Sequence, residues 1–227
     1  MHLGLIGGIG PAATEFYYRG LVKAYAALDE TLDLTIVNAS SRVLLDNMAK
    51  GAASEQAEIF RGFVERLQGA GADVAVVTSL SGHFCIRELE DVSPLPLFNA
   101  LPTLDRHFKR QRLGRVGLLG TRTVMESRLY GGISSAEIVM PQGADLDTVH
   151  DAYIAMAMAV AATDEQRELL VRMGEKLCRE QGADAVALVG TDLFLVFDGV
   201  SCGYPVIDCA RVHIEDIVAR ALATGSK

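Results

Sequence analysis

The stretch GADVAVV, residues 71–77, decides the fold, because a closely related stretch, GADAVAL, occurs again at residues 182–188. Each is a Gly-Ala-Asp turn followed by a run of small aliphatic residues, which is typical of a short strand buried in a parallel sheet. The two stretches are separated by 111 residues (182 − 71). We therefore expect the chain to contain a duplicated α/β unit.

Two further pairs of segments occur at nearly the same separation. GLIG at residues 4–7 corresponds to GLLG at 117–120, and PLFN at 96–99 corresponds to PVID at 205–208. Three matching segments in the same order are not expected by chance in a chain of this length. The pattern predicts an α/β fold of two similar doubly wound lobes, with mostly parallel sheets related by an internal pseudo-twofold repeat.

The repeat also predicts the domain organisation. We expect an N-terminal lobe at residues 1–99, a C-terminal lobe at 100–208, and a C-terminal helix at 209–227 that packs back on the first lobe. Within the lobes, Tyr17 corresponds to Tyr130. Because α/β folds bind ligands at the carboxyl ends of their strands, we expect the site in a cleft between the lobes, built from equivalent loops.

Composition limits the classes of partner. The chain has 227 residues, of which 50% are hydrophobic, and its net charge of -8 repels nucleic acid and anionic membranes. We expect neither as a partner. The start of the chain has no positively charged segment of a signal peptide, and no apolar run approaches the roughly 18 residues of a membrane-spanning helix. Four cysteines without a CxxC pair favour a cytoplasmic location.

Five motifs resemble those of the aspartate/glutamate racemase superfamily, the Asp/Glu/hydantoin racemases. Three agree closely, and two differ at their first residue, where the family has a catalytic cysteine. The agreeing motifs are GLIGGIGPAAT at 4–14, GLLGT at 117–121 and PVID at 205–208, followed by His213. The differing motifs are SLSGH at 79–83, where the family commonly reads Cys-Asn-Thr-Ala-His, and GTDL at 190–193, where it reads Cys-Thr-Glu.

The resemblance implies a cofactor-independent racemase that acts on an acidic amino acid or a similar small carboxylate. In that chemistry one thiolate removes the proton from the α-carbon and a thiol on the opposite face returns one. Here Ser79 and Gly190 stand at the two cysteine positions. A serine hydroxyl is a much weaker acid than a thiol, and glycine can transfer nothing. We therefore expect atypical or impaired catalysis.

The resemblance and the repeat give four candidate catalytic positions: Ser79, Gly190, His83 and Asp192. His83 could orient Ser79, bind a carboxylate or cap a helix. Asp192 occupies the acidic position of the family and is the nearest candidate proton carrier on its lobe. The interpretation that we favour for Asp192 is a helix N-cap.

Several residues of the loops after the strands are candidates for substrate binding. The turn at residues 7–11 offers backbone amides and a helix dipole to an anion, and the equivalent turn at 120–123 adds hydroxyls. Arg42 could form an ion pair with a carboxylate of the ligand, although an exposed surface position is equally expected. The candidates are Gly8, Ile9, Asn38, Arg42, Leu80, Ser81, Thr121, Thr123 and Thr191.

The remaining features indicate no metal and no organic cofactor, because neither a ligand cluster of metal-binding spacing nor a dinucleotide fingerprint occurs. The cysteines Cys85, Cys178, Cys202 and Cys209 are expected to be structural. Thr163 with Gln166 predicts a capping box that opens a helix. A homodimer is among the expected assemblies.

Three functions remain open from the sequence. The first is a racemase with rebuilt chemistry. The second is a decarboxylase or lyase on the same scaffold, which needs a proton on one face only. The third is a non-catalytic carboxylate-binding protein. For the first, we expect Ser79→Cys together with Gly190→Cys to raise racemase activity.

Overall fold

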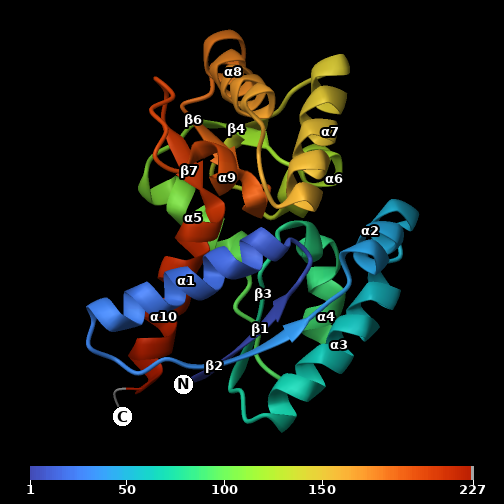
Figure 1. Ribbon diagram of the computed structural model, residues 1–227, viewed down its shortest axis with the longest axis vertical. Helices are drawn as coiled ribbons and strands as arrows, with labels where there is room; N and C mark the ends of the chain where they lie inside the picture. Colours follow the sequence, from blue (N-terminus) through green and yellow to red (C-terminus); the bar gives the residue numbers. More distant parts are fainter. Residues whose placement is uncertain (226–227) are drawn as a thin grey trace. The chain divides into compact units, whose positions relative to one another are not determined.

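The computed structural model describes residues 1–225, which form two compact units (Figure 1). Unit 1 contains Met1–Ala100 and the chain from His213 onward, and unit 2 contains Leu101–Val212. The boundaries therefore follow Ala100 and Val212 rather than Asn99 and Asp208. The second boundary lies inside the last helix, whose first turn extends directly from the last strand of unit 2.

Unit 1 is built on a parallel three-stranded sheet of order β2-β1-β3. In Figure 1, α1 and α3 lie on opposite sides of this sheet. The strands are β1 (His2–Gly7), β2 (Asp33–Asn38) and β3 (Val74–Val77). The helices are α1 (Pro11–Ala27), α2 (Ser41–Lys50), α3 (Ala53–Gly69), the 3₁₀ helix η1 (Ser81–Cys85), α4 (Ile86–Val92) and, from His213, α10 (Cys209–Gly225).

Unit 2 is built on a parallel four-stranded sheet of order β5-β4-β6-β7. The strands are β4 (Arg115–Leu119), β5 (Glu137–Val139), β6 (Ala185–Leu188) and β7 (Val206–Asp208). The helices are α5 (Ala100–Arg110), α6 (Arg122–Glu126), η2 (Leu129–Gly131), α7 (Ala144–Ala159), α8 (Asp164–Gln181), η3 (Thr191–Leu193) and α9 (Phe194–Phe197).

The two units have the same strand topology, so the predicted α/β class with two mostly parallel sheets is confirmed. β3 lies beside β1 as β6 lies beside β4. The correspondence extends to the sheet edge, where a parallel bridge between Ala75 and Leu97 occupies the place of the pairing between β6 and β7. In unit 1 the strand β3, and in unit 2 the strand β6, is followed by a 3₁₀ helix and then by an α-helix.

Each central strand carries a glycine that lets a helix approach closely. A Cβ on Gly4 would lie 2.9 Å from Leu67 Cδ1 of α3, and a Cβ on Gly117 would lie 3.1 Å from Leu177 Cβ of α8. Both leucines are buried, at 0% and 1% exposure. The repeat therefore conserves helix-to-sheet packing, because both glycine positions remove side-chain volume under an equivalent leucine.

The units differ after their first strand. In unit 1 this strand leads into the long helix α1, but in unit 2 it leads into α6, which ends at Glu126. Arg128, Leu129 and Tyr130 have φ values of 50°, 55° and 56°, in the left-handed region that a right-handed helix cannot contain. Tyr17 lies within α1 whereas Tyr130 lies in η2, so this pair does not occupy equivalent helices.

The close packing at the central strand gives a direct test. We expect Gly4→Ala to lower the free energy of unfolding by about 1–3 kcal/mol, because the added methyl group collides with Leu67. Gly62→Ala, inside α3, is the control: its Cβ would meet nothing within 4 Å, and the change should raise stability by up to about 1 kcal/mol. Urea denaturation measures both. Equal stability of Gly4→Ala and wild type would contradict this packing.

Candidate functional site

Ser79 lies just beyond the carboxyl end of β3 and is buried. Its Oγ accepts a hydrogen bond of 3.4 Å from the backbone N–H of Gly82, within the following 3₁₀ turn. Its carbonyl oxygen lies 2.7 Å from Nδ1 of His83. The hydroxyl group is therefore directed at the turn of η1, and His83 interacts with the backbone of Ser79 rather than with its side chain.

His83 is buried and uses both ring nitrogens on backbone groups. Nε2 lies 3.2 Å from the backbone nitrogen of Ala100, which can only donate, so Nε2 accepts. Nδ1 must then carry the proton and donate it to the carbonyl of Ser79. Burial lowers the pKa of His83 to about 4, so the ring is neutral at pH 7. This arrangement supports a structural role for His83 and leaves no ring nitrogen for the Ser79 hydroxyl.

His213, from α10, forms a second buried link beside the first. Its Nε2 donates to the carbonyl of Phe98 at 2.9 Å, and its Nδ1 accepts from the hydroxyl of Tyr17 at 2.9 Å. Burial, with a smaller contribution from His83, lowers its pKa to about 3. The two histidine rings lie edge to face, 6.3 Å apart. Together they connect the end of β3, α1, α10 and the segment at 98–100.

Gly190 lies just beyond the carboxyl end of β6, where Ser79 lies relative to β3. Its N–H donates to the carbonyl of Leu119 at 3.2 Å. A Cβ at this position would lie 2.7 Å from Cζ of Tyr153 and nearer still to Cε2. The ring of Tyr153, a residue of α7, therefore occupies the space that any side chain at position 190 would need.

Tyr153 is hydrogen-bonded to the candidate carboxylate of the same unit. Its hydroxyl donates to Oδ2 of Asp192 at 2.9 Å, and the two residues are only 5% and 1% exposed. Burial raises the pKa of Tyr153 well above 10, and the negative charge of Asp192 raises it further. The N-cap residue of η3 is Gly190, so the interpretation of Asp192 as a helix N-cap is wrong.

Helix α7 lies across the carboxyl ends of the two central strands of unit 2. One turn before Tyr153, Nδ1 of His150 accepts a hydrogen bond of 3.2 Å from the backbone N–H of Arg122, just beyond β4. Tyr153 itself meets Gly190 just beyond β6. This contact was not predictable from a motif, because none marks Tyr153. The available signal was topological: α7 follows β5 as α2 follows β2.

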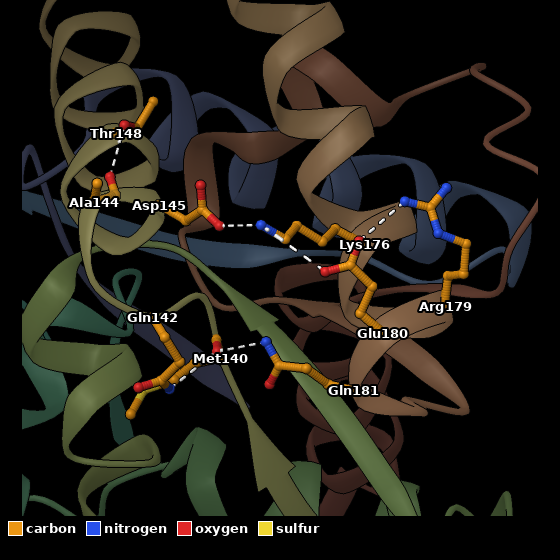
Figure 2. Close-up of polar contacts among 9 residues, drawn as sticks. All are labelled: Met140, Gln142, Ala144, Asp145, Thr148, Lys176, Arg179, Glu180 and Gln181. Carbon is orange, nitrogen blue, oxygen red and sulfur yellow. Dashed lines mark hydrogen bonds and ion pairs between the residues drawn. The ribbon is translucent and has the colours of Figure 1, made fainter.

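Two polar contacts fix α7 against α8, its neighbour in Figure 1. Near the start of α7, Lys176 Nζ lies 2.6 Å from Oδ2 of Asp145, as Figure 2 shows. Near Tyr153, Nε2 of Gln166 donates to the carbonyl of Ala152 at 3.4 Å. Gln166 also completes the predicted capping box with Thr163, which is confirmed. The position of Tyr153 is thus set by a helix held at two points.

The glycine turn after β1 uses part of its own hydrogen-bonding capacity. Gly8 has φ of +84°, and its N–H donates to Oγ1 of Thr14 at 2.8 Å. A Cβ on Gly8 would lie 2.6 Å from Cγ of Asn38. Asn38 Nδ2 donates to the carbonyl of Ala39 at 3.1 Å. The backbone amide of Gly8 is therefore already hydrogen-bonded to Thr14. The expected anion-binding turn has one donor fewer for an anion.

The other candidate residues lie in the loops after the strands of their own units, or at the start of the next helix. Ile9 packs beside Gly82, because its Cδ1 would lie 3.2 Å from a Cβ there. Four candidates are buried, namely Leu80, Ser81, Thr121 and Thr191. Thr123 is partly exposed in α6, and Arg42 is exposed at the start of α2. Their contact with a ligand stays a prediction.

The cysteines do not replace the absent thiols. All four are free. Burial raises the pKa of Cys85 to about 12, and burial also raises the pKa values of Cys178, Cys202 and Cys209. A thiolate is the reactive form of cysteine, so none of these residues supplies a nucleophile or base at neutral pH. The structure thus leaves Ser79 and the Tyr153–Asp192 pair, with the hydroxyls of Ser81 and Thr191, among the polar groups at the two equivalent strand ends.

Residues 1–225 contain no group of three or more His, Cys, Asp or Glu residues arranged to hold a metal ion. Within the same range, no helix has the length and hydropathy needed to cross a membrane.

Comparison with known proteins identifies a family and a fold. Residues 6–217 match the Asp/Glu/hydantoin racemase family. A protein from Yersinia pestis, provisionally described as an Asp/Glu racemase, is 26% identical, with a TM-score of 0.82 over 98% of this chain and 100% of its own. An aspartate racemase homologue from Pyrococcus horikoshii is 21% identical, with a TM-score of 0.78 over 97% and 98%. Glutamate racemase from Francisella tularensis, in complex with D-glutamate, is 11% identical, with a TM-score of 0.67 over 99% and 82%.

The two buried histidines predict that the protein loses stability in mild acid. Both folded-state pKa values, about 4 and about 3, lie below the ordinary value of 6.5. The two histidines of the unfolded chain therefore bind protons near pH 6.5, whereas those of the folded chain stay neutral until a lower pH. The stabilisation from the neutral histidines is present above pH 6.5 and is lost as the pH falls below it. We expect the free energy of unfolding to fall by about 3 kcal/mol between pH 6.5 and 5.

Urea denaturation at a series of pH values measures this loss. His213→Gln removes one of the two fully buried histidines and should reduce the change between pH 6.5 and 5 by about 1.5 kcal/mol, whatever its effect on stability at pH 7. A free energy of unfolding that does not vary with pH across this range would show that the two rings are not held neutral.

Proposed function

The chain belongs to the Asp/Glu/hydantoin racemase family, and from this we propose that it binds an acidic amino acid or a similar small carboxylate and acts on its α-carbon without a cofactor. The proposed site lies at the carboxyl ends of the strands, where α/β folds usually bind ligands. We further propose that catalysis is altered, because Ser79 and Gly190 stand at the two proton-transfer positions of the family.

The observation that supports this proposal is the equivalence of the two strand ends. Thr78 N–H donates to the carbonyl of Ile6 at 3.1 Å, and Val189 N–H donates to that of Leu119 at 2.8 Å. Ser79 and Gly190 are the next residues in the two units. A pair of equivalent positions is what proton transfer on opposite faces of one carbon requires, and carboxyl ends of strands are the usual ligand sites of α/β folds.

The same geometry argues for little conventional racemase activity. A serine needs a neighbouring base to act on a proton, and both nitrogens of His83 are already used on backbone groups. Among the described residues, the Ser79 hydroxyl is hydrogen-bonded only to the backbone N–H of Gly82, whereas unit 2 has the hydrogen-bonded pair of Tyr153 and Asp192. This one-sidedness favours a second candidate function, a decarboxylase or lyase, which handles a proton on one face only.

Ligand binding tests the proposed substrate class. We expect calorimetric titration with aspartate, glutamate and malate to detect at least one ligand, because the family acts on such acids. Adenine and guanine nucleotides serve as controls, and we expect no binding of either. The proposal would be contradicted if none of the acids bound and a nucleotide bound tightly.

The contact between position 190 and Tyr153 changes the expected effect of restoring cysteine. We expect Gly190→Cys to lower the free energy of unfolding by about 1–3 kcal/mol, because its Cβ overlaps the ring of Tyr153. In a Tyr153→Ala background the cost of Gly190→Cys should fall by at least about 1 kcal/mol. Gly62→Cys, with nothing within 4 Å of its Cβ, is the control and should show no such dependence.

Racemase activity should follow the same coupling. Adding Ser79→Cys to Gly190→Cys should raise racemisation only when Tyr153→Ala makes room for the second thiol. Urea denaturation measures the stabilities, and polarimetry measures the inversion. Additive effects of Gly190→Cys and Tyr153→Ala on stability would show that the ring does not fill the space at position 190.

A further inference from the structure

We propose that Tyr153 and Asp192 together carry a proton at the strand end where Gly190 has no side chain. Tyr153 is the group that exchanges a proton with the α-carbon of the ligand, and Asp192 is the positioning residue that takes up and returns the proton behind it. This inference rests on the proposed function and deepens it, because it assigns the proton carrier of unit 2.

The first argument is the position of the ring. Tyr153 does not merely pass near Gly190: a Cβ at position 190 would lie within 2.8 Å of Cδ2, Cζ and Cε2 of the ring. The tyrosine thus takes the place of a side chain on the strand end, reaching it from α7 instead of from the strand. The absence of a side chain at Gly190 is the condition that lets an aromatic ring reach this point.

The second argument is the partner of the hydroxyl. A tyrosine can satisfy its O–H with a backbone carbonyl, as the half-buried Tyr204 does with that of Val171 at 2.8 Å. Tyr153 instead donates to the carboxylate of Asp192, which is almost completely buried. Burying a carboxylate is costly unless strong hydrogen bonds compensate. A buried acid–base pair at the ligand-binding end of a sheet is a strong candidate for chemistry.

The proton-transfer step follows from the hydrogen bond. As the tyrosine oxygen accepts the proton of the α-carbon, the original phenolic proton moves along the hydrogen bond to Oδ2 of Asp192. The C–H bond breaks and its electron pair stays on the substrate, delocalised into the adjoining carboxylate. Tyr153 ends neutral and Asp192 ends protonated, so no tyrosinate forms beside a carboxylate. The reverse transfer returns a proton to the same face.

The pair acts on one face only. Among the described residues, no acid or base is hydrogen-bonded to the Ser79 hydroxyl, so we expect no comparable proton transfer from that strand end. We therefore expect the protein to exchange the α-proton of its ligand with solvent while retaining the configuration. Ser79→Cys, which supplies a thiol at the equivalent strand end of unit 1, should convert exchange into racemisation.

The test is exchange of the α-proton in D₂O, followed by NMR, with the acid that binds most tightly in the calorimetric panel. Tyr153→Phe keeps the ring and removes the hydroxyl. Asp192→Asn keeps an acceptor for the hydroxyl and removes the basic oxygen. Each change should slow exchange by at least about 100-fold, the usual contribution of a positioned proton carrier. The dissociation constant of the acid should stay within about threefold of the wild-type value.

Tyr204→Phe is the matched control, because it removes a hydroxyl and one hydrogen bond from the same unit. Its exchange rate should equal that of wild type. Circular dichroism and thermal melting establish that every variant is folded, and Asp192→Asn replaces Tyr153→Phe as the test if that variant is not.

Three results would overturn the inference. They are wild-type exchange rates in Tyr153→Phe or Asp192→Asn, binding of an acid by the wild-type protein without exchange of its α-proton, and racemisation by Ser79→Cys that persists after Tyr153→Phe is added. In each of these the acid still binds, so the proposed substrate class survives. Failure of every acid to bind is a different result, which overturns the proposed function and this inference with it.

Discussion

The strand end of unit 2 that contains Gly190 depends on one steric constraint: a side chain at position 190 and the ring of Tyr153 cannot occupy the same space. The Cβ that any other residue would bring to position 190 falls within 2.8 Å of three ring atoms. Glycine at 190, tyrosine at 153 and aspartate at 192 are therefore one arrangement. The hydrogen bond from Tyr153 to Asp192 holds the ring, and the missing side chain makes the room that the ring needs.

The contacts around the equivalent strand ends differ between the two units. In unit 1, neutral His83 and His213 bind backbone carbonyls and the hydroxyl of Tyr17, and they fix the segment that contains Ser79. In unit 2, the equivalent strand end is covered by α7, which brings an acid and a base together. The two units thus share a strand topology, while their equivalent strand ends carry different contacts: a histidine bonded to backbone groups in unit 1 and the Tyr153–Asp192 hydrogen bond in unit 2.

Much of the fold was predictable from the sequence, because the repeated segments are short buried strands and tight turns, which tolerate few substitutions. The two parallel sheets, their equivalent strands and the capping box at Thr163 follow from local patterns. The site was less predictable. The helix-cap interpretation of Asp192 is wrong, and the true partner was not predictable, because Tyr153 lies 39 residues away and no motif connects the two residues. The early end of α6, the helix after the first strand of unit 2, was not predictable, because left-handed residues such as Leu129 carry no sequence signal.

The most direct test of the account is a crystal structure of the wild-type protein with the tightest-binding acid. The account predicts that the α-carbon of the ligand lies within about 3–4 Å of the Tyr153 hydroxyl oxygen, the distance that proton transfer requires, while that oxygen remains hydrogen-bonded to Asp192. A ligand whose α-carbon lies away from Tyr153, with the Tyr153–Asp192 pair buried and unchanged beneath it, would contradict the account and reduce the pair to a packing element.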